Sequence, residues 1–153
     1  MAVEKSPSGT RGTRTPPRLL SKVLGPLMLW IHRRSGNRFN GMDLLYLTTV
    51  GAHSGQRRTS PVAYFGNGAG GWFIAASANG AARHPGWYHN IAANPDSVWA
   101  EVSGTTHRVR VEQLEGEPRE RAWAEIVSRA PRYDGYRSKT DRQIPVLRLT
   151  PVP

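Results

Sequence analysis

The chain contains no cysteine among its 153 residues. Disulfides, thiol nucleophiles and cysteine-ligated metal centres are therefore excluded, and the composition fits a reducing compartment such as the cytoplasm. Long hydrophobic runs are also missing, because no stretch approaches the roughly 18 to 20 apolar residues that a membrane-spanning helix needs. The five histidines form no H-x-x-x-H or H-x-H pair backed by a carboxylate, so we expect no metal site.

Acidic residues are scarce. Eleven Asp and Glu face 21 Lys and Arg, which gives a formal net charge of +10. The excess is concentrated in residues 1–38, which carry eight cations and the single anion Glu4. Such a basic chain is expected to bind phosphate groups on a nucleic acid, a lipid surface or a small cofactor.

Residues 1–15 are rich in Ser, Thr, Gly and Arg and offer almost nothing to bury, so we predict a disordered basic arm. Residues 16–38 are predicted to form a basic amphipathic helix. Thr15 can cap this helix, Pro16 and Pro17 suit its first turn, and Gly25-Pro26 should kink or split it. Its apolar positions recur every three or four residues and form one stripe: Leu20, Val23, Leu24, Leu27, Met28 and Ile31.

The stripe on 16–38 has two interpretations. It can pack across the domain, as the apolar face of any covering helix does. It can also lie on the anionic inner face of the cell membrane, with Trp30 near the headgroups and the basic residues toward the lipid phosphates. The sequence leaves both open.

Residues 39–153 are predicted to form one domain in the α+β class, mainly β. Two short helices are expected at 85–93 and 117–129, and six short strands are expected at 44–50, 59–65, 72–76, 98–102, 107–114 and 144–149. Turn signals between successive strands, such as Asn67-Gly68 and Ser103-Gly104, favour antiparallel pairing. A small barrel is the expected architecture, because closure removes exposed sheet edges.

The first candidate site is the turn 51–58, with the sequence GAHSGQRR. Its glycines can free backbone amides, and Arg57 and Arg58 can add charge-assisted bonds, a combination that suits a phosphate. The turn is neither a Walker loop nor a dinucleotide fingerprint. By itself it is equally consistent with an ordinary hairpin that carries solvated arginines.

The second candidate site is the segment 75–88. Small residues lead through Ser77 into a loop and a helix N-terminus, so the backbone can approach a flat ligand closely. Trp87 can stack on a ring, although a tryptophan on a short helix usually belongs to the core.

The third candidate site is the segment 133–142. Tyr133 and Tyr136 share one face of a helical turn, where their phenols can orient or protonate a substrate, although such pairs often only pack. Asp141 and Arg142 are expected to form tertiary ion pairs. With almost no acid–base groups elsewhere, the sequence indicates a cofactor that brings its own chemistry.

Three motifs in this order resemble the deazaflavin-dependent nitroreductases, a family that uses coenzyme F420: LTTVGAHSGQRRTSPVAYF, AASANGAARHPGWYHNIAANP and RYDGYRSKTDRQIPVLRL. The resemblance extends from Leu44 to Pro151. It implies a split β-barrel related to FMN-binding barrels, an actinobacterial cytoplasmic setting, and hydride transfer from reduced F420 to quinones, nitroaromatics or similar acceptors. FMN is the alternative cofactor.

The resemblance also implies roles for individual residues. Tyr133, Tyr136 and Ser77 are the implied catalytic residues. The implied cofactor-binding residues are His53, Ser54, Gly55, Arg57, Arg58, Pro61, Tyr64, Ala76, Ser77, Ala78, Pro85 and Trp87. Within this set the turn 51–58 binds the phosphate and oligoglutamate tail, and the backbone of Ala76 and the Ser77 hydroxyl contact the ring.

The chain departs from the family pattern in its cations. Ala52-His53 stands where the family usually has Arg-Lys, Ala78 stands where it has lysine, and Arg57 replaces a common proline. A family tyrosine near the substrate is Ala130 here. Uncompensated loss of charge-assisted bonds of about 1.5–3 kcal/mol each predicts weaker cofactor binding.

Two other functions remain open at this point. A non-catalytic barrel that holds a flavin, a deazaflavin or a fatty acid fits the depleted cation set. A nucleic-acid-binding barrel fits the basic arm and the interspersed aromatic residues. Residues 39–153 are nearly balanced in charge, however, so we expect no nucleic-acid partner. The oligomeric state is left undetermined.

Overall fold

The computed structural model describes residues 3–14, 18–39 and 41–153. The proposed cap Thr15 and the prolines Pro16 and Pro17 lie outside this part. Eight strands form one antiparallel sheet: β1 (Arg38–Phe39), β2 (Met42–Val50), β3 (Arg57–Ala63), β4 (Phe65–Gly66), β5 (Trp72–Ala75), β6 (Trp99–Val102), β7 (Thr105–Gln113) and β8 (Val146–Pro151). The six expected strands are therefore confirmed. The additional strands β1 and β4 are two residues long, too short to show a sequence pattern.

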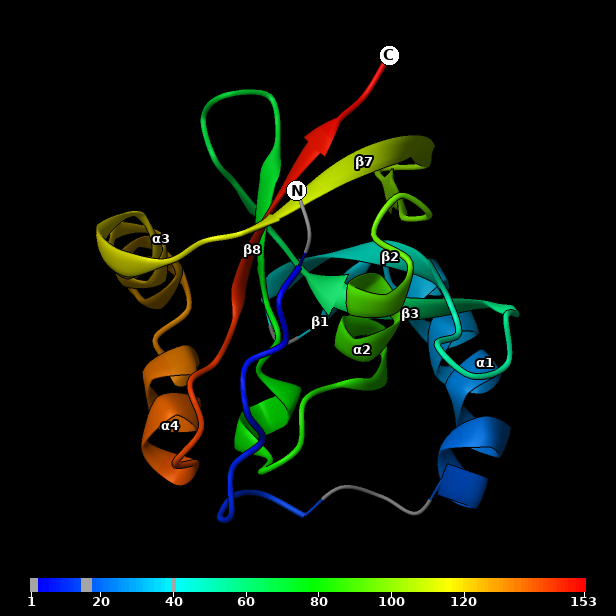
Figure 1. Ribbon diagram of the computed structural model, residues 1–153. Helices are drawn as coiled ribbons and strands as arrows, with labels where there is room; N and C mark the ends of the chain where they lie inside the picture. Colours follow the sequence, from blue (N-terminus) through cyan, green and yellow to red (C-terminus); the bar gives the residue numbers. More distant parts are fainter. Residues whose placement is uncertain (1–2, 15–17, 40) are drawn as a thin grey trace.

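The sheet follows the order β1-β2-β6-β7-β8-β5-β4, and β3 pairs with β2 along Leu44–Val50. It curves into a half-barrel, which confirms the predicted split β-barrel (Figure 1). The connections β2–β3 and β6–β7 are hairpins. Ser103 and Gly104 turn the second hairpin with φ angles of 50° and 84°, as a tight antiparallel turn requires.

The helices are α1 (Arg18–Arg34), α2 (Gly86–Ala93), α3 (Gly116–Arg129) and α4 (Arg132–Lys139), with a 3-10 turn η1 (Ala78–Gly80) before α2. The helix α1 continues through Pro26, so it is not split there. Figure 1 shows α3 and α4 together on one side of the half-barrel and α1 on the other. Within the described residues, no helix combines the length and apolarity that crossing a bilayer requires.

Two apolar clusters hold the domain together. The first fills the inside of the curved sheet, where Leu45, Leu47 and Leu149 are fully buried, and α2 closes it with Tyr88 and Ile91. The second lies between the sheet and the pair α3–α4 and contains Phe65, Trp123, Ile126, Tyr133 and Val146. The site described below lies where α4, α1 and the rim of the first cluster meet.

The N-terminal segment 3–14 has almost no regular structure but lies along the domain between α4 and α2 (Figure 1). Val3 is buried among core residues. The amide of Ser6 donates to the Tyr88 hydroxyl (3.0 Å), and Gly9 donates to the carbonyl of Ala82 (2.8 Å). These contacts differ from the disordered arm that the composition predicts, because backbone groups and one buried valine attach the segment where its side-chain pattern shows no apolar stripe.

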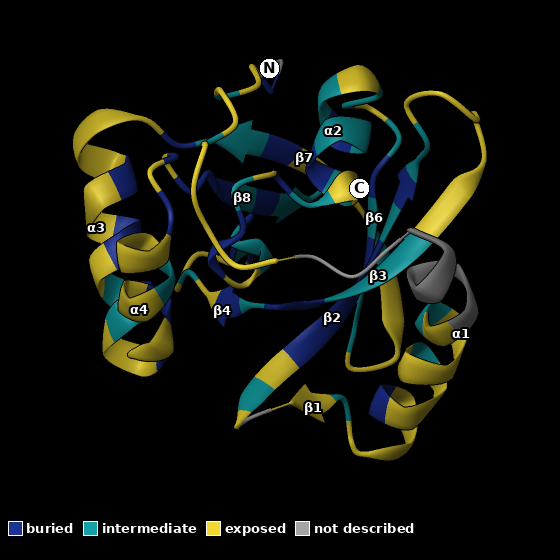
Figure 2. Ribbon diagram, turned by 90° about the horizontal axis from the view of Figure 1, so that it is seen from below, coloured by how far each residue is buried: buried dark blue, intermediate teal, exposed yellow. Residues whose placement is uncertain are grey.

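The apolar side chains of α1 that the structure describes are largely uncovered. Leu24, Leu27, Met28, Trp30 and Ile31 are 39–55% exposed, and Figure 2 shows the part of α1 that is not drawn in grey mostly in the exposed colour. Polar contacts near its C-terminal end attach it instead. Arg33 pairs with Glu101 (2.9 Å) and lies over the ring of Tyr46 (4.2 Å).

Candidate functional site

A cleft of about 310 Å³ opens between α1, the exposed edge of β3, the turn η1 and α4. Most of its wall is apolar, and a few polar groups enter it from η1 and α4. The lining residues are Met28, His32, Phe39, Met42, Leu44, Pro61, Val62, Ala63, Ala75, Ser77, Ala78, Asn79, Pro85, Trp87, Arg132, Tyr133 and Tyr136. An apolar pocket with a few convergent polar groups is typical of a small-molecule site.

Seven of the residues singled out from the sequence lie in this cleft. They come from β3, η1, α2 and α4, which are far apart along the chain: Pro61, Ser77, Ala78, Pro85, Trp87, Tyr133 and Tyr136. The structure therefore brings the second and third candidate sites together. Trp87 packs partly against the barrel core while it also lines the cleft, so the two interpretations of this side chain both apply.

The two tyrosines of α4 differ in environment. Tyr133 is 4% exposed and packs edge-on against Phe65, Trp123 and Tyr136. Burial, with a smaller contribution from Tyr136, raises the pKa of Tyr133 to about 12. The phenol therefore remains a neutral hydrogen-bond donor at any physiological pH. Tyr136 is half-buried and lies nearer the solvent.

The turn η1 brings strained backbone to the cleft. Ala78 and Asn79 have φ angles of 45° and 54°, in the left-handed region that residues with a Cβ rarely adopt. Gly80 follows at 79° and lies against α4, where a Cβ would be 3.0 Å from the carbonyl oxygen of Tyr136. Such strain persists only where surrounding contacts determine the conformation, and it is frequent at ligand sites.

The turn 51–58 lies outside the cleft, and much of its backbone is already hydrogen-bonded. The amides of Gly51 and Gly55 donate within the turn, to Gln56 (2.8 Å) and Gly51 (3.0 Å). The amide of Ala52 donates to Asn90 on α2 (3.0 Å), and that of Gln56 donates to the Ser54 hydroxyl (3.2 Å). The glycines therefore shape the turn rather than offer amides to an anion, and positive charge must come from side chains.

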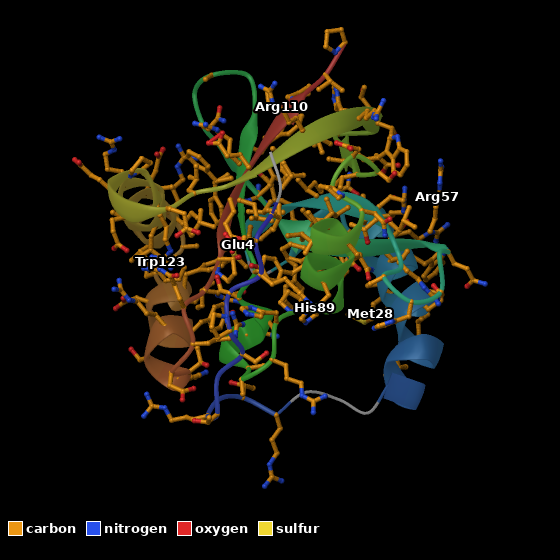
Figure 3. The ribbon with its side chains drawn as sticks, viewed as in Figure 1. Glu4, Met28, Arg57, His89, Arg110 and Trp123 are labelled. Carbon is orange, nitrogen blue, oxygen red and sulfur yellow. The ribbon has the colours of Figure 1, made fainter. Side chains whose placement is uncertain are left out.

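The two arginines at the end of the turn, Arg57 and Arg58, point to opposite faces of the sheet. Arg58 pairs with Thr49, whose hydroxyl accepts a hydrogen bond from Asn90 on α2, so Arg58 is on the α2 side. Arg57 pairs with Val50 and stacks over Trp99 at 4.3 Å. Figure 3 shows Arg57 at the outer rim of the molecule. Arg58 is therefore the arginine of the turn on the α2 side of the sheet.

A second recess, of about 410 Å³, adjoins this turn and contains His53 together with Lys5 and His89. Burial, followed by the charge of Lys5 and the proximity of His53, lowers the pKa of His89. This recess brings one lysine and two imidazoles together from three elements. Sequence reasoning did not single out Lys5 or His89, because neither lies in a motif.

Besides the residues of the turn 51–58, two further predicted residues lie away from the cleft. Tyr64 packs edge-on against Trp72 (6.5 Å) beside the first cluster. Ala76 is fully buried, and its amide and carbonyl are both engaged, by Pro145 (2.9 Å) and Arg142 (3.0 Å).

Sequence reasoning also missed the wall that α1 and β1 provide. Met28 lies on the side of α1 that faces the cleft (Figure 3). His32 is 7% exposed and packs edge-on against Phe39 at 5.2 Å. No sequence signal distinguishes these residues from the rest of the amphipathic stripe. Among the residues that the structure describes, no group of three His, Cys, Asp or Glu side chains is arranged to hold a metal.

The model of the F420H(2)-dependent quinone reductase family matches residues 30–151. An F420H(2)-dependent quinone reductase of Mycobacterium tuberculosis is 35% identical over 147 residues, covering 87% of this chain and 96% of the relative. A solved F420-H2 dependent reductase (FDR-A) is 36% identical over 70% of this chain and 93% of its own, with a TM-score of 0.63.

A haem storage protein of Vibrio cholerae, HutZ, is 17% identical over 85% of this chain and 91% of its own, with a TM-score of 0.55, and it shares the fold alone. The family match and the two reductases are more specific, because the family model spans β3, η1 and α4 and the two reductases are 35% and 36% identical to this chain. The chain belongs to the F420H(2)-dependent quinone reductase family, whose members are oxidoreductases that use coenzyme F420.

Proposed function

We propose that this chain reduces a quinone with reduced F420 in the cleft between β3, η1 and α4. The convergence of seven motif residues from four elements on this one cleft carries the proposal. Reduced F420 supplies the hydride when it is bound. Trp87 and Pro61 would hold the flat ring, and the turn around Ser77 would contact its polar edge.

The residues present fit such a cofactor at both ends. The cleft offers aromatic and apolar walls for a ring, and the recess with Lys5, His53 and His89 adjoins α2, on the side of the sheet to which Arg58 points. We assign the anionic phosphate and tail to Lys5 and Arg58, with the imidazoles of His53 and His89 as neighbouring hydrogen-bonding groups. The two cations replace the charges that the family has at the positions of Ala52 and Ala78.

We assign the acceptor to the side of the cleft formed by Tyr133 and Tyr136. A neutral phenol can donate a hydrogen bond to the acceptor oxygen as negative charge develops there, and the high pKa of Tyr133 keeps it in that state. Nitroaromatic compounds develop negative charge on oxygen in the same way. The same geometry therefore serves them as a second class of acceptor.

Replacement of the phenol tests this assignment. We expect Tyr133→Phe to lower kcat for menadione by about a hundred- to a thousandfold, the range for loss of one donor to a developing oxyanion, while the Kd for F420 changes little. Tyr64→Phe is the matched control, because Tyr64 lies outside the cleft and should keep both values. Equal losses of kcat and affinity in Tyr133→Phe would contradict the division of roles.

We also propose that α1 binds an anionic membrane surface. Its exposed apolar side chains adjoin exposed arginines, and Arg34 stacks over Trp30 at 4.8 Å, an arrangement suited to the headgroup region. Met28 and His32 belong to both α1 and the cleft wall. A lipid-soluble quinone would thus meet the cleft on the membrane-facing side.

A pair of charge-matched variants tests the membrane proposal. Arg34→Gln and Arg110→Gln each remove one exposed positive charge, but Arg110 lies on β7, far from α1 (Figure 3). Since one basic residue near an anionic bilayer contributes about 1 kcal/mol, Arg34→Gln should weaken binding to phosphatidylglycerol-containing vesicles about fivefold. Arg110→Gln should have little effect. Equal losses would indicate attraction by net charge alone.

A further inference from the structure

A buried arginine, Arg142, holds the strained turn η1 although it does not line the cleft itself. Arg142 is 6% exposed, and its guanidinium has four uncharged partners. Nε donates to the carbonyl of Ala81 (2.8 Å), Nη2 donates to that of Ser77 (2.7 Å), and Nη1 donates to that of Ala76 (3.0 Å). The three carbonyls precede and follow η1, so one rigid side chain spans both ends of the turn.

The ion pairs expected for Asp141 and Arg142 are not formed: among the described residues, no ion pair includes either side chain. Asp141 accepts hydrogen bonds from the hydroxyl and amide of Thr10 and from the amide of Arg11. Arg142 turns inward instead. A buried cation is costly unless hydrogen bonds replace its hydration, and backbone carbonyls whose positions are fixed provide that replacement here.

The fourth partner of Arg142 links it to the N-terminal segment. Because arginine has no acceptor, Nη1 donates to Nδ1 of His84 (3.1 Å), so the His84 proton lies on Nε2. That nitrogen then donates to the carbonyl of Ser6 (2.8 Å). The same segment reaches η1 directly, since the amide of Thr13 donates to the carbonyl of Gly80 (3.0 Å).

We infer that Arg142 is a positioning residue for hydride transfer: by fixing the carbonyls of Ala76, Ser77 and Ala81 it keeps the left-handed turn 78–79 in the shape that receives the cofactor. The inference rests on the proposed function, in which the Ser77 turn contacts the ring. Residues with a Cβ leave the left-handed conformation unless several contacts determine their backbone. Around Ala78 and Asn79, the planar guanidinium of Arg142 supplies these contacts by binding the neighbouring carbonyls.

Arg142→Lys tests this role, since lysine keeps the charge but lacks the fork. Arg119→Lys is the matched control: Arg119 is 5% exposed and also donates to a backbone carbonyl, that of Ile144 (2.7 Å), but from α3 and outside the cleft. At a temperature where both variants are folded, Arg142→Lys should lower kcat/KM for menadione at least about tenfold, the loss of one charge-assisted bond. Arg119→Lys should stay within about twofold.

Hydrogen exchange of the protein alone gives a second measurement that needs no cofactor. The amides of Gly80 and Ala81 donate within the turn, at 2.9 and 3.0 Å. Arg142→Lys should speed their exchange at least about tenfold, whereas Arg119→Lys should not. If the wild type fails to oxidise reduced F420 but exchange changes as expected, the proposed function fails and the positioning of the turn stands. If both variants lose activity only in proportion to melting temperature, the inference is wrong.

His84 variants test the same network should Arg142→Lys not fold. His84→Asn keeps an acceptor near the position of Nδ1, toward Arg142, but loses the donor toward Ser6. His84→Gln keeps a donor near the position of Nε2, toward Ser6, but loses the acceptor toward Arg142. If the guanidinium positions the turn, His84→Gln should lower kcat/KM at least about threefold more than His84→Asn, a difference within the range for one hydrogen bond. Equal losses, or a larger loss in His84→Asn, would overturn the inference.

Discussion

The helices α1 and α3 carry similar amphipathic patterns but lie in opposite environments. In α3 the apolar face is covered, so that Trp123 is 3% exposed and Ile126 is fully buried. In α1 the corresponding face is open, with Leu27 50% and Trp30 55% exposed. Figure 3 places Trp123 inside the left-hand side of the molecule, beneath α3. Hydrophobic periodicity thus identifies the apolar face of a helix, but it does not identify the surface that buries this face.

The attachments of the two helices differ in kind. The pair α3–α4 contributes to the second apolar cluster, so burial stabilises it. The helix α1 is held near its C-terminal end by Arg33, which contacts Glu101 and Tyr46, and by Asn37, which accepts a hydrogen bond from Tyr46 (2.6 Å). Polar attachment leaves the apolar stripe free for another surface. The difference predicts unequal effects of mutations on the two sides.

Truncation of Trp123 should have the largest effect on stability. Trp123→Ala removes a buried ring that packs against Tyr133, and we expect a loss of about 3–5 kcal/mol in the free energy of unfolding. Urea denaturation measures this loss. Trp123→Phe is the control, because the buried indole Nε1 has no hydrogen-bond partner among the described groups and its removal leaves nothing unpaired. A loss below about 1 kcal/mol in Trp123→Ala would mean that α3 is no better anchored than α1.

The second largest effect is expected for the free energy of unfolding at alkaline pH. Burial raises the pKa of Tyr133 to about 12, above the value of about 10 in an unfolded chain. Folding therefore disfavours ionisation of the Tyr133 phenol. The contribution of Tyr133 to the free energy of unfolding is complete below pH 10 and is lost as the pH rises through about 12. Two pKa units correspond to about 2–3 kcal/mol.

Unfolding of the wild type and Tyr133→Phe between pH 8 and about 12 measures this contribution, because only the wild type should lose it above pH 10. Parallel curves would show that Tyr133 is accessible to water in solution. The burial of α4 against the sheet would then be looser than the structure indicates.

The fold was predictable from the sequence wherever local pattern and tertiary contact agree. The strands β2, β5 and β8 are mainly apolar, β2 and β8 also contain Val and Thr, and the turn at Ser103-Gly104 sets its hairpin locally. The burial of Val3 was not predictable, because one valine in a polar segment gives no periodic signal.

The site was predictable only in part. Motif spacing pointed to Ser77, Trp87 and Tyr133, which the fold does bring into one cleft. The amides of Gly51, Ala52, Gly55 and Gln56 in the turn 51–58 are occupied because Asn90 and the turn itself satisfy them, a tertiary fact that local sequence does not encode. Arg142 contacts carbonyls more than 60 positions away in the chain, and no pattern relates them.

Weakening the polar attachment of α1 should have a small effect. Glu101→Gln removes the partner of Arg33, and both side chains are partly exposed, so we expect a loss of about 0.2–1 kcal/mol. Urea denaturation at low and high salt measures it, and salt should reduce the difference between wild type and variant. Glu117→Gln is the control on α3, where the pair with Arg121 is more exposed (3.6 Å). A loss above about 2 kcal/mol would place α1 within the cooperative core.

The smallest effect on stability is expected from Leu27 on the open face of α1. Leu27→Gln keeps helix propensity, and the side chain is already 50% exposed, so the free energy of unfolding should change by less than about 0.5 kcal/mol. Binding to anionic vesicles should nevertheless weaken about tenfold, since a leucine that enters the bilayer contributes about 1.5–3 kcal/mol. If the variant is instead destabilised by about 2 kcal/mol without a change in vesicle binding, protein covers this face in solution, and α1 resembles α3 after all.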